Sequence, residues 1–195
     1  MKITNRLLFI VMLTCCGLYV SAQTLIQRDP EIEKMVKEVN ADSLKSYILK
    51  MVSYGTRNTL STQSDPNRGI GAARNWVLQK FNEFAKKSNG RFSSFIDTTT
   101  LQPVAGSRVE RPVVLGNVVG ILKGTDTADK RIFVISGHLD NMRTNVRDSV
   151  GDAPGANDDA SGCAAVIECA RIMTQKSFPA TIIFVTVSGE EQGLL

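Results

Sequence analysis

Three consecutive segments decide the fold: IFVI at 132–135, DASGCAAVIECARIMTQ at 159–175 and IIFVTV at 182–187. The first and third are nearly unbroken apolar runs rich in β-branched residues, as in strands buried on both faces of a parallel sheet. The middle segment carries apolar residues at helical spacing. Strand, helix and strand in this order form a βαβ unit, which predicts an α/β fold.

The residues before this unit predict further helices and strands. Three amphipathic helices and two strands are expected, at about 30–39, 44–52, 70–84, 92–101 and 113–122. The stretch 55–68 is rich in Ser, Thr, Asn and Asp, so we interpret it as a loop. The helices therefore come first, and the strands follow from residue 92 onward.

Composition excludes several classes of protein. Of the 195 residues, 43% are hydrophobic and 22% charged, which is typical of a globular domain. The formal net charge of +4 is scattered without a basic stripe, so we expect no nucleic-acid partner. Cys163 and Cys169 are six positions apart on one predicted helix, too far for a disulfide between them.

The first 22 residues have the regions of a secretory signal peptide. Lys2 and Arg6 form a positive start, residues 7–20 are apolar, and Val20-Ser21-Ala22 is a small-residue cleavage signal. The apolar run is shorter than the roughly 20 residues that span a bilayer.

We therefore expect cleavage after residue 22 and one domain over 23–195. The product would be secreted or placed in the periplasm or cell envelope, with no stable membrane span. An uncleaved anchor, or lipid attachment at Cys15 or Cys16, is the alternative.

Polar clusters stand at the ends of the predicted βαβ strands. GHLD at 137–140 follows the first strand, PGANDDASG at 154–162 leads into the helix, and SGEEQG at 188–193 follows the second strand. Open α/β sheets bind ligands at the carboxyl ends of their parallel strands. All three clusters are expected at that edge.

Each cluster also has a purely structural interpretation. His138 could be a partly buried histidine, Asn157 to Asp159 could cap the helix, and Glu190 and Glu191 could be a solvated pair. All three would have to hold at once on one edge of the sheet, so we favour a functional interpretation.

An imidazole and several carboxylates at one edge predict a metal site. These groups suit zinc, and carboxylates can bridge two metals. In extended chain His138 and Asp140 face the same way, so Asp140 can orient the histidine. Of Glu190 and Glu191, one could hold metal while the other moves a proton, and the spacing leaves open which does which.

The set GHLD, PGANDDASG and VSGEEQGLL resembles the motifs of the secreted co-catalytic di-zinc exopeptidases of peptidase family M28. That family includes bacterial leucyl aminopeptidases, glutamate carboxypeptidases and, more distantly, glutaminyl cyclases. The resemblance covers about residues 113–195, and the earlier SYGTRNT and GIGAARNWV are similar to the family's N-terminal region. It implies a three-layer α/β fold with a mostly parallel central sheet.

The resemblance also implies an activity and the residues that carry it. Two zinc ions would activate water to hydrolyse the terminal bond of a peptide substrate, most simply as an aminopeptidase. His138 would bind one zinc, Asp158 would bridge both, and Glu191 would bind the other. Glu190 would be the catalytic general acid and base.

The resemblance also gives two further aspartates counterparts among the family residues that support the metal ligands. Asp140 would match the partner of the metal-bound histidine. Asp159 would match the residue after the bridging aspartate, where the family has a non-proline cis peptide bond.

The same resemblance implies an aspartate and a histidine beyond the glutamate pair as further zinc ligands. The sequence ends at Leu195, and His138 is its one histidine. We therefore expect the N-terminal part of a longer domain, inactive alone, with an incomplete sheet and exposed apolar surface beside 182–187. The alternatives are a glutaminyl cyclase-like zinc acyltransferase and a non-catalytic remnant on a peptidase fold.

Overall fold

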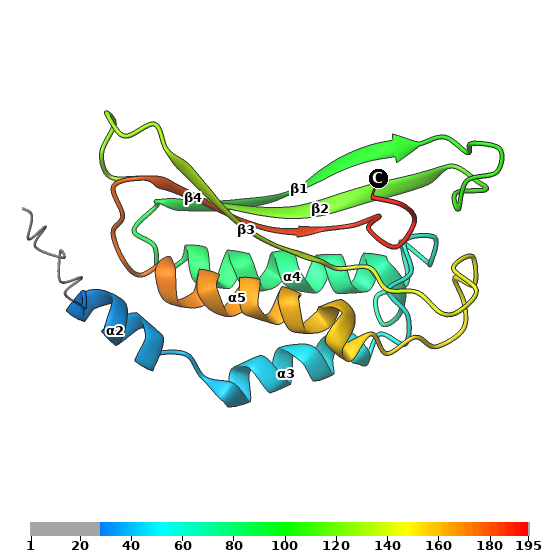
Figure 1. Ribbon diagram of the computed structural model, residues 1–195, viewed down its shortest axis with the longest axis horizontal. Coiled ribbons are helices and arrows are strands. Elements are labelled where there is room, and N and C mark those ends of the chain that lie inside the picture. Colours follow the sequence, from blue (N-terminus) through cyan, green and yellow to red (C-terminus); the bar gives the residue numbers. More distant parts are fainter. Residues whose placement is uncertain (1–27, 195) are drawn as a thin grey trace, which may run out of the picture. The chain divides into compact units, whose positions relative to one another are not determined.

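The computed structural model in Figure 1 describes residues 28–194. The predicted signal peptide, residues 1–22, lies outside the described residues and stays a prediction. The chain divides into two units, residues 1–34 and residues 35–195. Within residues 28–194, no helix combines the length and the apolar character that crossing a membrane requires.

The order of helices and strands follows the prediction. In chain order the elements are α2 (Pro30–Lys37), α3 (Ala41–Val52), α4 (Gly69–Ala85), β1 (Phe92–Leu101), β2 (Val113–Leu122), β3 (Ile132–His138), the π-helical turn η2 (Ala156–Ala160), α5 (Ser161–Met173) and β4 (Thr181–Val187). Residues 55–68 contain no helix or strand before Gly69, as predicted.

The strands form one mixed sheet in the order β1-β2-β4-β3. Strands β3 and β4 are parallel, as the βαβ pattern predicted, whereas β1–β2 and β2–β4 are antiparallel. The α/β class is therefore confirmed, but the described sheet is mixed where we expected it to be mostly parallel. The connection from β1 to β2 is shorter than the crossover that a parallel pair needs, so this pair is antiparallel.

Helices α4 and α5 pack on the sheet, and α3 packs against α5 (Figure 1). The helices of residues 35–194 lie on one face of the sheet, so two of the three expected layers are present there. Cys163 and Cys169 are both free thiols on α5, as predicted.

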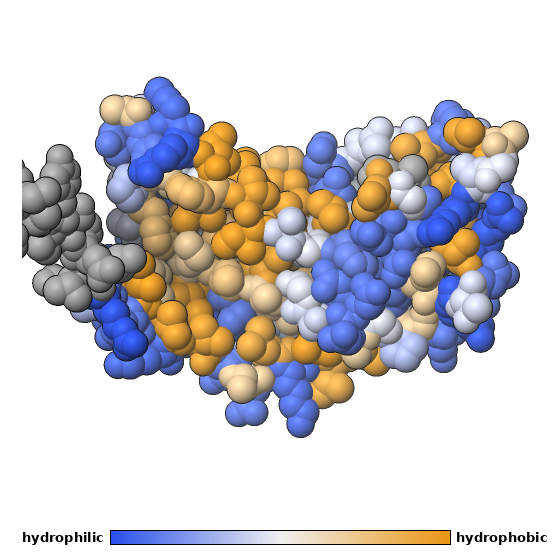
Figure 2. All heavy atoms as spheres, in the orientation of Figure 1, coloured by the Kyte–Doolittle hydropathy of each residue, from blue (hydrophilic) through white to orange (hydrophobic). Residues whose placement is uncertain are grey.

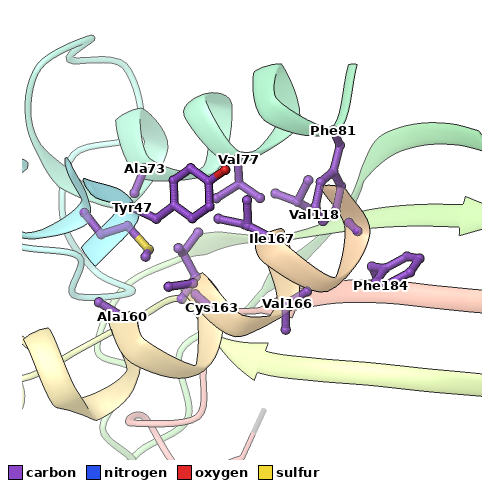
Figure 3. Packing of buried hydrophobic residues seen from close by; sticks show 14 of the residues in the cluster. Tyr47, Ala73, Val77, Phe81, Val118, Ala160, Cys163, Val166, Ile167 and Phe184 are labelled. Carbon is purple, nitrogen blue, oxygen red and sulfur yellow. The ribbon is translucent and has the colours of Figure 1, made fainter. Parts of the chain in front are cut away.

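The core lies between these helices and the sheet (Figure 3). Phe92 of β1 meets Phe81 of α4 and Phe184 of β4 edge to face, with ring centroids 5.8 and 6.0 Å apart. A Cβ on Gly120 of β2 would lie 2.4 Å from the Phe92 ring, so only glycine fits beneath this cluster. The polar clusters follow where β3 and β4 end, at His138 and Val187.

The outer strand β3 is more exposed than its sequence predicted. Ile132, Phe133 and Val134 are 60%, 53% and 60% exposed, although the run was expected to be buried on both faces. Within the described residues β3 pairs only with β4, which leaves its other edge uncovered. The most exposed apolar residues therefore lie on β3, next to β4, whose residues alternate between partly exposed and buried. Figure 2 shows hydrophobic residues gathered in this region.

Candidate metal centre

Three of the predicted metal ligands converge at one end of the sheet. One ligand atom from each of His138, Asp158 and Glu191 lies within 4.8 Å of the others. The parallel register pairs His138, the last residue of β3, with Val187, the last residue of β4. The segment after β4 therefore begins beside His138, as expected for the carboxyl ends of parallel strands.

The His138 ring is held between two aspartates. Its Nε2 lies 3.0 Å from Oδ1 of Asp158, and its Nδ1 lies 3.2 Å from the backbone oxygen of Asp140. Oδ1 of Asp140 is 3.7 Å from the same Nδ1. A neutral imidazole that donates from Nδ1 to Asp140 presents the lone pair of Nε2 toward Asp158, which is the orientation that a metal ligand needs.

The buried carboxylate of Asp140 connects the segments that follow β3 and β4. Asp140 is fully buried, and its Oδ2 accepts hydrogen bonds from the Thr59 hydroxyl at 2.9 Å and from the Glu191 N–H at 3.1 Å. Its Oδ1 has no hydrogen-bond partner among the described residues. A buried carboxylate oxygen turned toward a histidine ring fits the group that orients a metal-bound histidine.

Asp159 holds the start of α5 against the end of β3. Its Oδ2 accepts the His138 N–H at 3.0 Å, and its Oδ1 accepts the Gly162 N–H at 2.8 Å. The helix begins at Ser161 and not at the predicted Asp159, because Asp158 and Asp159 have non-helical backbone angles. The peptide bond between these two aspartates is cis, as the resemblance implied.

The two glutamates after β4 differ in their surroundings. Glu191 is buried, and its backbone oxygen accepts a hydrogen bond from Nη1 of Arg108 at 2.6 Å. Glu190 is partly exposed, and its charge acts on both His138 and Glu191. Glu191 belongs to the group of converging ligand atoms and Glu190 does not. The sequence had left their division of roles open, and this placement favours Glu191 as the ligand.

The electrostatics of the cluster favour a cation. Burial is the largest single effect on the pKa of His138 and lowers it. The charges of four carboxylates together outweigh burial and raise this pKa overall. These carboxylates belong to Asp140, Asp159, Glu190 and Asp158. Burial raises the pKa of Glu191, and the charges of Asp158 and Asp140 raise it further. The cluster thus gathers more negative charge than one imidazole can balance, which a bound dication would neutralise.

The donor set fits zinc in kind and spacing. Zinc in proteins binds histidine nitrogen and carboxylate oxygen at about 2.0–2.2 Å, so two donors of a tetrahedral site lie roughly 3.3 Å apart. The 3.0 Å contact between His138 and Asp158 is close to that separation. The same contact also has hydrogen-bond length, so the convergence of Glu191 on the pair is what favours a metal.

The fold and the site together define a class of protein. It is an α/β protein with a cluster of one histidine and several carboxylates at the carboxyl ends of its parallel strands. Residues 117–195 match peptidase family M28. Over 166 residues the chain is 45% identical to a probable zinc metalloprotease of Leptosphaeria maculans, covering 85% of this chain and 38% of that protein. It is also 45% identical over 166 residues to one of Pyricularia oryzae, covering 85% of this chain and 32% of that protein. Residues 117–195 therefore place this part of the chain in peptidase family M28, and the chain spans about a third of the length of these curated relatives.

Solved structures show the same fold. An aminopeptidase of Legionella pneumophila is similar with a TM-score of 0.60 at 24% identity, covering 89% of this chain and 43% of that one. A glutaminyl cyclase of Porphyromonas gingivalis reaches the same TM-score at 18% identity, covering 80% of this chain and 48% of that one. At such identities the similarity concerns the fold alone.

Three residues that support the metal-ligand segments were not predicted from the sequence. Arg57, Thr59 and Asn141 are all buried and hydrogen bonded around the segments that carry the ligands. Arg57 and Thr59 belong to SYGTRNT, which we read only as part of a loop. A loop has no periodicity, so the one available signal was the resemblance of this segment to the family's N-terminal region.

Proposed function

We propose that the protein containing this chain is a zinc-dependent exopeptidase, most simply an aminopeptidase. The observation that carries the proposal is the convergence of ligand atoms from His138, Asp158 and Glu191 at the ends of β3 and β4. The curated relatives named zinc metalloproteases support the choice of metal and reaction. Zinc, when bound, supplies Lewis acidity that polarises a carbonyl group and activates water.

The chain's own residues take complementary roles in this proposal. His138, Asp158 and Glu191 would hold the zinc, and Asp140 would keep Nε2 of the histidine directed at it. Glu190 accepts a proton from water and delivers it to the departing amine, because its partly exposed carboxylate lies next to the ligands without being one of them.

We further propose two zinc ions bridged by Asp158. The Asp158 side chain is 74% exposed, so its carboxylate is open on the side away from His138. Asp159 supports the centre indirectly, through its hydrogen bond to the His138 backbone. A zinc-to-protein ratio of two in the full-length protein, falling in an Asp158→Asn variant, is the expected result.

Peptides outside the cytoplasm are the proposed substrates, because residues 1–22 have the pattern of a secretory signal. N-terminal sequencing of the protein from its source cells tests this point. A mature chain that starts at Gln23 agrees with export, and a chain that keeps Met1 contradicts cleavage.

The decisive assay uses short peptides that differ in their blocked ends. The full-length zinc-loaded protein is incubated with a peptide amidated at the C-terminus, with one acetylated at the N-terminus, and with one that begins with glutamine. We expect release of the N-terminal residue from the first and no cleavage of the second. Cleavage of the second alone would indicate a carboxypeptidase, and ammonia release from the third without hydrolysis would indicate a glutaminyl cyclase.

A non-catalytic protein on the same fold predicts a different result. It would turn over none of the three peptides and would purify without stoichiometric zinc. Zinc content measured on the same preparation therefore separates an inactive zinc protein from a protein that binds no metal.

A further inference from the structure

Arg57 is a buried cation in the loop between α3 and α4. It is 1% exposed and is the largest of the fully buried side chains within residues 28–194. Among the described residues it forms no ion pair with a carboxylate. Taking an unpaired charge out of water is costly, so each of its donors needs a partner.

The partners of the guanidinium are backbone carbonyls from the segments that carry the metal ligands. Its Nε donates to the oxygen of Leu139 at 2.8 Å, and Leu139 directly follows His138. Its Nη1 and Nη2 donate to the oxygens of Pro154 and Gly155, both at 2.9 Å, in the turn that leads to Asp158. One side chain thus connects the His138 segment to the Asp158 segment.

The other contacts of Arg57 fix the residue itself. Nη1 also lies 3.3 Å from the oxygen of Met51 at the end of α3, and the backbone N–H donates to Oδ1 of Asn141 at 2.9 Å. The amide of Asn141 in turn donates to the oxygen of Ala153 at 2.6 Å. Arg57 is therefore held from its backbone to the tip of its side chain.

The chemistry of guanidinium suits this task. Its five N–H donors have a fixed planar geometry, so carbonyls bound to it are held at fixed relative positions. Burial lowers the pKa of Arg57, while nearby acidic groups, Cys163, Asp140 and Asp159, raise it. An ordinary arginine pKa lies so far above neutral pH that the side chain remains charged.

We propose that Arg57 is a positioning residue for the metal centre, setting the separation of His138 from Asp158 through the carbonyls of Leu139, Pro154 and Gly155. The inference rests on the proposed zinc site and deepens it. Without the guanidinium, the two ligand segments would lose their shared anchor, and the ligand atoms would no longer be held at metal-binding distance.

The test compares zinc affinity in folded variants of the full-length protein. Zinc dissociation constants are measured by competition with a chelator for the wild type, Arg57→Met and Arg57→Lys. We expect Arg57→Met to weaken binding by about 10–100-fold, as is usual when support behind metal ligands is lost. Arg57→Lys should be intermediate, because an ammonium group cannot reach all three carbonyls in the same geometry.

Arg171→Met is the matched control. Arg171 lies near the C-terminal end of α5, with two hydrogen bonds to the Glu168 carboxylate and one to the backbone oxygen of Glu38. Its loss should lower thermal stability but leave zinc affinity within about twofold of the wild type, because it touches neither ligand segment. The visible spectrum of the cobalt-substituted protein should change in the Arg57 variants and stay unchanged in Arg171→Met.

The outcomes are distinguishable. Wild-type zinc affinity in a folded Arg57→Met variant overturns the positioning role, and so does an equal loss of affinity in Arg171→Met. If Arg57→Met does not fold, Arg57→Lys decides, and unchanged affinity in that variant contradicts the proposal. A wild-type protein that binds no zinc overturns the proposed function itself.

Discussion

The side chain of Asp140 accepts a hydrogen bond from the backbone N–H of Glu191, with an N–O distance of 3.1 Å. Asp140 follows β3 and Glu191 follows β4, so this bond joins the ends of the two parallel strands. Both residues are buried, where hydrogen bonds to an ionised carboxylate are strong. The bond therefore couples the segment that carries His138 to the segment that carries Glu191.

Replacing Asp140 by asparagine tests this coupling. The amide keeps the size of the side chain but removes the negative charge beside Nδ1 of His138. We expect zinc affinity to fall by about 10–100-fold. Asp152→Asn is the control, because Asp152 is exposed and pairs with Arg68 at the surface. The zinc affinity of this variant should stay within about threefold of the wild type. Equal effects in both variants would contradict a specific role for Asp140.

Replacing each of the two glutamates after β4 should impair a different property of the protein. Glu190→Gln should lower kcat/KM for peptide hydrolysis by about 10²–10⁴-fold while zinc stays bound, because a general base is lost and no ligand is. Glu191→Gln should lose zinc, because a ligand atom is weakened. Zinc content by mass spectrometry, measured beside activity, separates the two results. Equal metal loss in both variants would show that the assigned roles are wrong.

A methyl group at Gly162 should displace the Asp159 carboxylate and so disturb the candidate metal centre. A Cβ there would lie 2.3 Å from Oδ1 and 2.4 Å from Oδ2 of Asp159, so the carboxylate would have to move. That carboxylate accepts the His138 N–H. We expect Gly162→Ala to cost about 1–3 kcal/mol of folding free energy and to weaken zinc binding. Ala165→Gly, at an exposed position of α5, should cost about 1 kcal/mol without changing zinc affinity.

The ion pair between buried Glu168 and partly exposed Arg171 in α5 predicts a pH-dependent stability. Burial raises the pKa of Glu168, but hydrogen bonds from Arg171 and from the Asn40 N–H lower it below its ordinary value of 4.5 overall. The ionised carboxylate therefore stabilises the fold above about pH 4.5, and this contribution is lost as the pH falls through the lower folded pKa.

We accordingly expect Glu168→Gln to lose about 1.5–3 kcal/mol in urea unfolding at pH 7, and the difference from the wild type to shrink below pH 4.5. Glu83→Gln is the control, since Glu83 forms a half-exposed pair with Lys80 and should cost less than about 1 kcal/mol. A difference for Glu168→Gln that is the same at pH 3 and pH 7 would contradict the assigned pKa.

Periodicity predicted the elements whose own side chains bury an apolar face. The strands Phe92–Leu101 and Val113–Leu122 have the predicted bounds, and the helices lie within a few residues of theirs. The clusters at the strand ends could be placed at one edge because the βαβ topology leaves few alternatives. That placement also predicted that carboxylates would lie next to His138.

Features that depend on distant partners could not be read in the same way. The start of α5 moved to Ser161 because the Asp159 side chain takes the N–H of His138, a contact across 21 positions of sequence. Arg57 looked like a loop residue because its carbonyl partners lie up to 98 positions away. The apolar run of β3 indicated burial, but its place at the edge of the described sheet is set by strand order.

Anomalous diffraction at the zinc edge, from crystals of the full-length zinc-loaded protein, tests the central claim most directly. We predict one zinc peak about 2.0–2.2 Å from Nε2 of His138 and from a carboxylate oxygen of Asp158, and a second peak at the same distance from a carboxylate oxygen of Glu191. A zinc peak away from His138 and Glu191, or no zinc at the ends of β3 and β4, would contradict it.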